Sequence, residues 1–203
     1  MNMEYETKRL ELKILPDTAA AQVLRFYLDN QEIFEKYETD RIPNFYTEKF
    51  QKMLLQSEYN LAVKQTLIRF WVYEKGRTDR IAGTVSIHNI KRGFYQSCEL
   101  GYKFDQEFWG KGYARESISK CTQIIFEELK LHRIEAYVLP ENAASKKLLG
   151  KLGFELEGVK KQNVKLHGLW RDHELYALLE KDVLEKKEVI GPDSGTSNRI
   201  LRC

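Results

Sequence analysis

The chain has 203 residues, of which 42% are hydrophobic and 31% are charged. This length suits one sizeable core, and the composition argues against a wholly disordered or fibrous protein, so a single α/β or α+β domain is expected. The 33 basic and 30 acidic residues leave a formal net charge of +3, which requires neither a nucleic acid nor an anionic membrane as a partner.

The first third of the chain predicts one strand followed by helices. Apolar and charged residues alternate over residues 9–14, which is the period of a strand with one buried face, and Pro16 ends this strand. Apolar residues over 20–28 recur at three- and four-residue spacing and predict a helix. Further helices are expected over 31–37 and 47–62.

The central part predicts antiparallel strands and then a long helix. Residues 68–73 are rich in β-branched and aromatic side chains, and 81–87 form a second extended run after a turn at 76–79. These two runs predict an antiparallel hairpin, and a third strand is expected over 97–104. Apolar residues then fall on one helical stripe over 114–129.

The last part of the domain predicts a strand, a helix and a closing hairpin. Residues 134–138 alternate as a strand does, and Asn142 can cap a helix that continues to residue 153. Two strand-like runs, 154–166 and 169–179, lie on either side of His167-Gly168, where the glycine can supply the positive φ of a tight turn.

The cysteines and the chain ends bear on compartment and extent. Cys98, Cys121 and Cys203 show no CxxC spacing, so neither a disulfide framework nor a thiolate zinc site is indicated. The N-terminus is polar and acidic, and no apolar run approaches the ~20 residues of a membrane helix, so we expect a cytoplasmic protein with no membrane partner. Residues 1–185 are predicted to form a single domain, and 186–203 a disordered tail.

The segment Trp109-Gly110-Lys111-Gly112-Tyr113-Ala114 joins a predicted strand to a predicted helix. Its glycines allow close approach of the backbone to a ligand, and the amides at a helix start attract an anion. Because Lys111 and Arg115 add full positive charges, a diphosphate is the expected ligand. The spacing matches neither GxxxxGK[ST] nor GxGxxG. On this segment alone, a glycine-rich turn that only starts a helix is an equally good interpretation.

Three motifs in order resemble one known family. They are Thr7 to Leu12, then Glu99-Leu100-Gly101-Tyr102 followed by Phe108 to Ala114, and finally Asn142 to Phe154. Together they resemble the GNAT superfamily, specifically its ribosomal-protein-alanine N-acetyltransferase (RimJ/RimL-like) branch, over about residues 7–182. The resemblance implies an α/β (α+β) GNAT fold, with a central mixed, mostly antiparallel, splayed sheet of about seven strands flanked by helices.

The resemblance also implies acetyl-CoA as a cosubstrate. In this family the pantetheine arm lies like an extra strand along a splayed strand, and the pyrophosphate lies on loop amides. The implied coenzyme contacts are the backbone of Tyr102, Lys103 and Phe104, the side chain of Asn142, and the loop residues Trp109, Gly110, Lys111, Gly112, Tyr113, Ala114 and Arg115. Trp109 stands where the family usually has Gln or Arg.

Acetyl transfer to an amine needs a donor for the thioester oxygen and a proton for the leaving thiolate. The family pattern assigns the first task to a backbone amide near Tyr102. For the second we nominate Ser145, three residues beyond Asn142, because Leu149 occupies the position of the tyrosine that many members use. The alternative is that Ser145 only satisfies an amide at the helix start.

The amine must also lose a proton, and Glu99 is the nominated base. A carboxylate inside a strand is costly unless it faces a cleft, and Glu99 could accept the proton through a water. The alternative is one half of an ion pair. His88 and Glu157 are weaker candidates, and the glutamate that related enzymes carry near position 164 is Val164 here.

Three hypotheses for the function remain open. In the first, the enzyme transfers an acetyl group directly, through a ternary complex, to the N-terminal α-amino group of a protein, with a ribosomal protein as the leading example. In the second, the acceptor is a small amine such as a polyamine, an amino sugar or an antibiotic. In the third, the chain is a non-catalytic CoA-binding module. No metal is predicted, since the histidines form neither HxxxH nor HExxH. No nucleic-acid partner is predicted either, because the chain has no large excess of positive charge. A monomer or a homodimer is expected.

Overall fold

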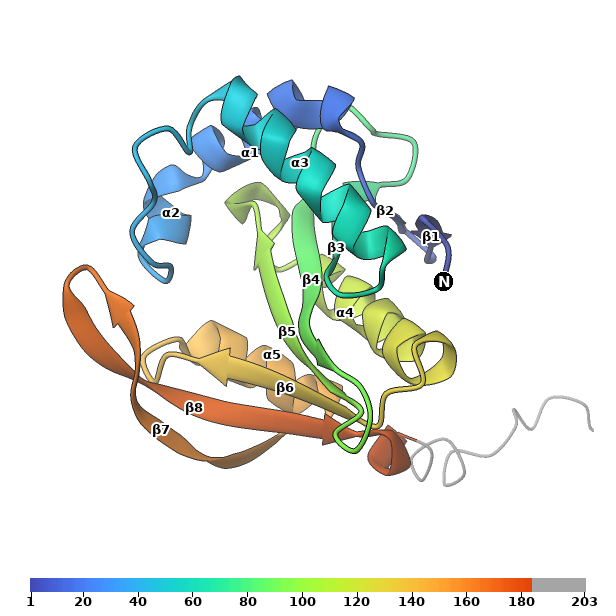
Figure 1. The fold of residues 1–203 in the computed structure, drawn as a ribbon, viewed down its shortest axis with the longest axis vertical. Helices are drawn as coiled ribbons and strands as arrows, with labels where there is room; N and C mark the ends of the chain where they lie inside the picture. The colour runs from blue at the N-terminus through green and yellow to red at the C-terminus, as the bar shows by residue number, and fades with distance from the viewer. Residues whose placement is uncertain (184–203) are drawn as a thin grey trace, which may run out of the picture.

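One eight-stranded sheet runs through residues 1–183, the part of the chain that the computed structural model describes (Figure 1). Its strands are β1 (Glu4–Glu6), β2 (Leu10–Lys13), β3 (Ile68–Glu74), β4 (Gly83–Lys91), β5 (Ser97–Phe104), β6 (Arg133–Val138), β7 (Glu155–Leu166) and β8 (Leu169–Leu179). The α-helices are α1 (Ala20–Asp29), α2 (Gln31–Glu35), α3 (Glu48–Val63), α4 (Tyr113–Gln123) and α5 (Ala143–Leu152). Short 3-10 turns, η1 (Asp17–Ala19) and η2 (Gln106–Phe108), precede α1 and follow β5.

The sheet is antiparallel except at its centre, where it opens. The strand order is β1-β2-β3-β4-β5-β6-β8-β7, and within residues 1–183 only β5 and β6 pair in parallel. That pairing covers Ser97–Glu99 of β5 alone, although β5 stays paired with β4 as far as Phe104. Beyond Glu99 the two strands diverge (Figure 1). We call the gap between residues 100–104 of β5 and 136–138 of β6 the splay.

Each face of the sheet carries its own core. Phe70 and Val72 of β3 belong to the core beneath α4 and α5, whereas Trp71 and Tyr73 belong to the core beneath α1 and α3. This alternation is what a strand buried on both faces requires. On β5, Leu100 and Phe104 likewise face α4 and α5, so Glu99, Gly101 and Lys103 project from the opposite face.

The structure confirms the predicted mixed sheet and corrects its details. The sheet has eight strands rather than seven, because β1 was not predicted: three residues with one buried side chain, Tyr5, give too short a pattern to recognise. The predicted helix over 114–129 is α4 followed by a π-helical turn, η3 (Ile124–Glu128). The helix predicted over 31–37 is the shorter α2. The predicted tail, 186–203, lies outside the described residues.

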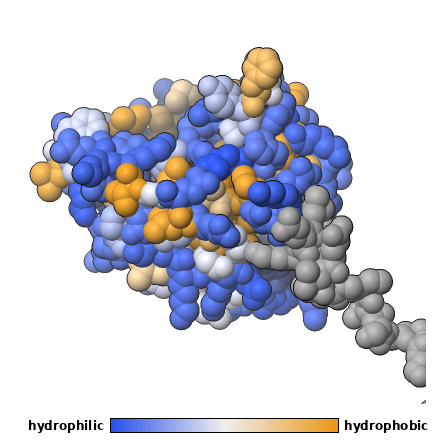
Figure 2. Space-filling model, turned by 90° about the horizontal axis from the view of Figure 1, so that it is seen from below, coloured by the Kyte–Doolittle hydropathy of each residue, from blue (hydrophilic) through white to orange (hydrophobic). Residues whose placement is uncertain are grey.

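The face of the molecule seen in Figure 2 is mostly hydrophilic. Figure 2 views the molecule from below, where β7 and β8 lie in Figure 1, and shows separate apolar patches among charged and polar side chains. Leu156 and Val159 of the edge strand β7 are exposed there. None of the helices within residues 1–183 is long and apolar enough to cross a membrane.

Candidate active site

The loop after β5 leaves a set of backbone amides without partners. Gly110 and Gly112 have φ values of 76° and 79°, a left-handed conformation that favours glycine. Gly112 caps α4 with no side-chain acceptor, and the first intrahelical bond runs from Glu116 N to the Gly112 carbonyl at 3.1 Å. The amides of residues 113–115 are therefore free of helical partners. Residues 109–115, here called the coenzyme loop after their predicted ligand, thus have the free amides at a helix start from which the sequence analysis predicted an anion site.

Aromatic side chains fix the coenzyme loop to the sheet. Phe108 and Tyr113 are buried and stack with ring centroids 5.9 Å apart, and the Tyr113 hydroxyl donates to Glu74 of β3. The Trp109 indole Nε1 donates to the Phe104 carbonyl at 2.9 Å. That carbonyl therefore already accepts one hydrogen bond at the end of β5. Trp109 itself remains largely exposed.

A second anchor, from the N-terminal strands, was not found from the sequence. Arg9 Nη1 donates to the Lys111 carbonyl at 2.9 Å, and Arg9 Nη2 lies 2.7 Å from a carboxylate oxygen of Glu116. Thr7 Oγ1 donates to the same carboxylate at 2.6 Å. Burial raises the pKa of Glu116, but these donors outweigh it and lower the pKa below its ordinary value. The β1–β2 turn therefore holds the coenzyme loop and the first turn of α4 together.

On the α5 side of the splay, two hydroxyl groups meet. The Tyr102 hydroxyl of β5 lies 2.6 Å from Ser145 Oγ of α5. Burial raises the pKa of Tyr102 to about 12, against the lowering effect of this hydrogen bond. The sequence indicated only backbone roles for Tyr102, because nothing local in it places the phenol ring beside a helix some forty residues further along.

The Ser145 hydroxyl is not used as a helix cap. The Asn142 side chain caps α5 instead, since its Oδ1 accepts a hydrogen bond from the Ser145 amide at 3.1 Å. Leu149, where many relatives of the resembled family carry tyrosine, is fully buried in the core. The alternative interpretation, a serine that only satisfies a helix amide, is therefore not what the structure shows. Ser145 presents its hydroxyl to Tyr102 at the splay.

Glu99 lies on the other face of β5. Its Oε2 is 3.7 Å from Nδ1 of His88 on β4, and its side chain is 19% exposed. In register it faces His88 on one side and Glu135 on the other, which is the last pair before β5 and β6 diverge. Glu157, the weaker candidate, is instead held by Arg133, whose Nη1 donates to Glu157 Oε1 at 2.8 Å. Ser145 and Glu99 thus flank the same strand from opposite faces.

A family model described as an acetyltransferase (GNAT) domain matches residues 9–155, well over half of the chain. The chain belongs to the GNAT acetyltransferases. The Bacillus subtilis (strain 168) protein described as "Probable N-acetyltransferase YjcK" is 35% identical over 175 residues, which are 86% of this chain and 96% of that protein.

Two solved structures resemble this GNAT acetyltransferase closely. The ribosomal-protein-S5-alanine acetyltransferase of Vibrio fischeri superposes with a TM-score of 0.83 at 29% identity, covering 89% of this chain and 98% of that one. RimJ of Mycobacterium smegmatis, solved in complex with CoA-disulfide, gives 0.80 at 26% identity, covering 86% and 83%. The predicted fold, family and N-acetyltransferase class are therefore confirmed.

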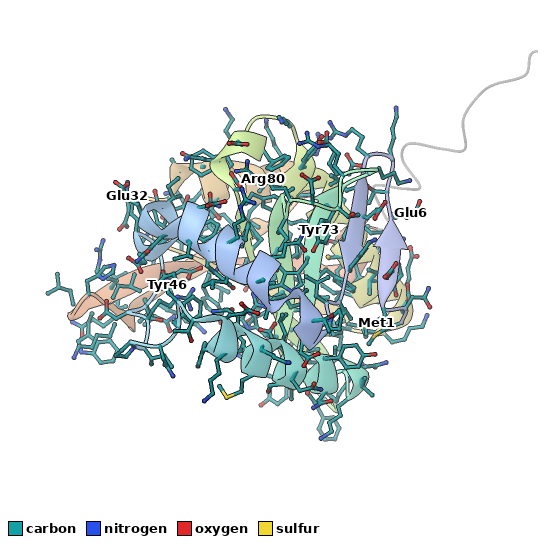
Figure 3. The ribbon with its side chains drawn as sticks, turned by 90° about the horizontal axis from the view of Figure 1, so that it is seen from above. Met1, Glu6, Glu32, Tyr46, Tyr73 and Arg80 are labelled. Atoms are coloured by element: carbon teal, nitrogen blue, oxygen red, sulfur yellow. The ribbon has the colours of Figure 1, made fainter. Side chains whose placement is uncertain are left out.

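The far side of the splay in this acetyltransferase is bounded by two segments distant in sequence. His167, in the β7–β8 turn, bonds through Nδ1 to Asp40 Oδ1 at 2.8 Å and through Nε2 to the Glu35 carbonyl at 2.9 Å. The Tyr46 hydroxyl donates to the Glu35 side chain at 2.6 Å, and Figure 3 shows Tyr46 near the tip of the hairpin. We call residues 29–47 together with 162–171 the acceptor rim.

Lys103 links the acceptor rim to the sheet. Its ammonium group contacts Glu38 in the segment after α2, and Glu38 also contacts Arg41. Burial lowers the pKa of Lys103 well below its ordinary value, and the charges of Arg69 and Arg41 lower it further. The side chain of Lys103 therefore belongs to the acceptor side, whereas the sequence assigned only its backbone, to the coenzyme.

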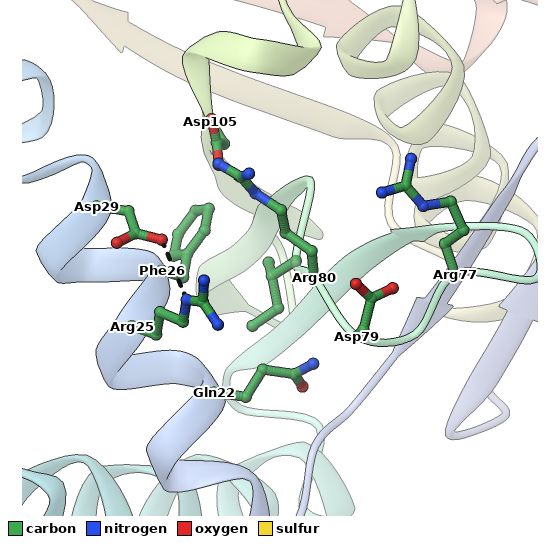
Figure 4. Close-up of a pocket in the computed structure, with 9 residues that line it drawn as sticks. Gln22, Arg25, Phe26, Asp29, Arg77, Asp79, Arg80 and Asp105 are labelled. Carbon is green, nitrogen blue, oxygen red and sulfur yellow. Dashed lines mark hydrogen bonds and ion pairs between the residues drawn. The ribbon is translucent and has the colours of Figure 1, made fainter.

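The pocket in Figure 4 contains none of the predicted site residues. It lies between α1 and the segment 77–81, and Arg80 crosses it to Asp105, with Nη2 2.7 Å from Oδ2. Asp105 is 2% exposed, and its Oδ1 accepts from the Glu107 amide at 3.0 Å, which caps η2. The contacts of Asp105 with Arg80 and with the Glu107 amide fix the chain just after β5. Within residues 1–183, no group of three or more His, Cys, Asp or Glu side chains could hold a metal ion.

Proposed function

We propose that this N-acetyltransferase transfers the acetyl group of acetyl-CoA directly, in a ternary complex, to the N-terminal α-amino group of a protein. Ribosomal proteins are the first acceptor class to test. The observation that carries the proposal is the pair of opposed groups at the splay, Ser145 with Tyr102 on one face and Glu99 on the other. The likeness to an enzyme named for acetylating ribosomal protein S5 supports the acceptor class.

The residues present fit the coenzyme. The positive φ angles of Gly110 and Gly112 bring the amides of the coenzyme loop to the surface, where Lys111 and Arg115 are exposed. Residues 100–104 of β5 lack a β6 partner, so their backbone can bond an extended arm. The complex of Mycobacterium smegmatis RimJ with CoA-disulfide supports the same ligand class. When bound, acetyl-CoA supplies the activated acetyl thioester.

Ser145 gives a proton to the departing sulfur in this proposal. Its hydroxyl is held by Tyr102 at 2.6 Å, and the phenol can return a proton to the serine once the serine has donated its own. Burial keeps Tyr102 neutral at physiological pH, because it raises the pKa to about 12. Asn142 sets the position of Ser145, because its side-chain oxygen accepts a hydrogen bond from the Ser145 amide. A backbone amide near Tyr102 stabilises the negative charge that develops on the carbonyl oxygen.

Glu99 is the carboxylate towards which the proton of the amine moves in this proposal. It lies on the acceptor side of β5, at the point where the splay opens. A group that bridges the amine and this carboxylate, either a water molecule or a neighbouring side chain, completes the path. Acid and base are thereby kept apart by the strand itself, because alternate residues of β5 face opposite sides of the sheet.

Release of free CoA thiol from acetyl-CoA, measured against a panel of peptides and small amines, tests the function. Turnover of peptides that begin with Ala or Ser is expected. Turnover confined to polyamines, amino sugars or antibiotics would favour the small-amine hypothesis instead. Binding of acetyl-CoA without turnover of any amine would indicate a non-catalytic CoA-binding module.

The Ser145→Ala variant tests the acid. Its turnover number is expected to fall about 100-fold, while its affinity for acetyl-CoA stays within about twofold, because only the proton transfer is lost. Calorimetry and the thiol assay measure the two quantities. The exposed Ser57→Ala on α3 is the matched control. An unchanged turnover number in Ser145→Ala would remove Ser145 from the mechanism.

A further inference from the structure

We propose that His88 is the group that takes the proton from the acceptor amine, and that Glu99 orients His88 rather than reaching the amine itself. This inference deepens the proposed function and rests on it. His88 lies on β4 directly opposite Glu99 in the register of the sheet. Its Nδ1 faces the Glu99 carboxylate at 3.7 Å.

The other ring nitrogen of His88 lies further along β5, towards its unpaired end, than Glu99 does. A Cβ atom added at Gly101 would lie 3.4 Å from His88 Nε2 and 2.9 Å from Ser86 Oγ. Nε2 therefore lies over Gly101, two residues beyond Glu99 along β5. Only glycine leaves room for the imidazole and Ser86 together at this position.

The placement of Gly101 decides between the two candidate bases. Glu99 is paired with Glu135 of β6, so β6 still lies beside it at the closed end of the splay. Gly101 lies past the last pair, next to Tyr102, whose hydroxyl reaches Ser145 on the opposite face. Among residues 1–183, Nε2 of His88 has no hydrogen-bond partner, and the side chain is 36% exposed. With Nε2 over Gly101, the imidazole lies beside the part of β5 that has no β6 partner.

The charges around His88 keep it able to accept a proton. Burial lowers the pKa of His88, the Glu99 carboxylate raises it, and Arg69 of β3 lowers it, with the net result below the ordinary value. Arg69 itself is paired with Glu58 of α3, with Nε 2.8 Å from Oε1. Since an ordinary histidine titrates near pH ~6.5, His88 is neutral at pH 7.

The proton path then balances. The neutral amine forms its bond to the carbonyl carbon and gives one proton to His88 Nε2, while the bond from that carbon to sulfur breaks. Ser145 supplies the proton to the sulfur and takes one from Tyr102, and Tyr102 is reprotonated from solvent. The positive charge on the His88 ring faces Glu99, which stabilises it, and His88 then releases its proton to solvent.

The experiment compares His88→Gln, Glu99→Gln and the control His132→Gln, a histidine that is exposed in the turn before β6. The amine used is the best acceptor of the wild-type protein. We expect kcat/KM of His88→Gln to fall about 100-fold and that of Glu99→Gln about tenfold. Affinity for acetyl-CoA should stay unchanged in both, which also verifies that each variant is folded.

The pH profile separates a base from its orienting partner. In the wild type and in His132→Gln, kcat/KM is expected to rise through an ionisation below pH ~6.5, followed by that of the amine. The first ionisation disappears in His88→Gln. In Glu99→Gln it persists at lower pH, because loss of the carboxylate removes the charge that raises the pKa of His88.

Each other outcome contradicts a different claim. Loss of the low-pH ionisation in Glu99→Gln together with its survival in His88→Gln would make Glu99 the base. Wild-type kcat/KM in His88→Gln would overturn the inference and leave the proposed function intact. If the wild type acetylates only small amines, the proposed acceptor class is wrong. The role of His88 is then tested by comparing kcat/KM of the same variants with those amines. If it acetylates nothing, both claims fail.

Discussion

The coenzyme loop and the acceptor rim are held in different ways. The loop is fixed mainly by buried aromatic side chains and by the positive φ angles of two glycines in one short segment, with added support from Thr7 and Arg9. The rim depends on single side-chain contacts between segments far apart in sequence, such as exposed His167 with Asp40. Because the first construction presents backbone amides, it suits a ligand recognised without particular side chains, whereas few substitutions in the second would change the acceptor that fits.

The largest effect is expected from Gly112→Val. A side chain at φ 79° is strained, and its Cβ would lie 3.4 Å from the Arg9 guanidinium, so the free amides behind it would be displaced. Affinity for acetyl-CoA is expected to fall on the order of 100-fold, or about 2.7 kcal/mol, measured by calorimetry. Gly158→Ala on β7, where an added Cβ meets nothing within 4 Å, is the control. Near-normal affinity in Gly112→Val would exclude the loop as the phosphate site.

An intermediate loss of affinity for acetyl-CoA is expected from Arg9→Gln. This change removes the ion pair with Glu116 and the donor to the Lys111 carbonyl, so the loop loses its support from the N-terminal strands. Because Arg9 is partly exposed, the loss is modest, about 1 kcal/mol, or about fivefold in the affinity for acetyl-CoA. KM for the amine should not change. A variant that alters only the amine KM would show that Arg9 serves the acceptor instead.

The smallest effect is expected from Asp40→Asn. The Glu35 carbonyl and Asp40 both raise the pKa of His167. The charged contact is thus complete below the unfolded value of pH ~6.5 and is lost as the pH rises through the raised folded value. The acceptor KM is expected to rise a few-fold in Asp40→Asn, most strongly at low pH, with acetyl-CoA affinity unchanged. Steady-state kinetics from pH 5.5 to 8.5 check this, and a pH-independent KM ratio would contradict it.

The same contrast explains what the sequence revealed. Alternation and helical spacing predicted most strands and helices, and the glycines at 110 and 112 indicated the loop, because these signals are local. The short β1 and the π-helical turn at Ile124–Glu128 left no such signal.

The chemistry of the splay was harder to predict, for a physical reason. Ser145 and Glu99 could be nominated one by one, and their catalytic roles stay predictions. The hydroxyl contact between Tyr102 and Ser145 depends on how β5 and α5 meet across the core, and the position of His88 over Gly101 depends on strand register. Neither follows from a pattern within one segment.

The brace formed by Thr7 and Arg9 on Glu116 gives the N-terminal strands a share in ligand binding. A ligand that binds the loop in this conformation stabilises every contact specific to the conformation. It therefore also stabilises the contacts of Thr7 and Arg9 with Glu116. Amide hydrogen exchange across β1 and β2 is accordingly expected to slow when the coenzyme is added. The first dozen residues of this chain thus report on occupancy at a distance.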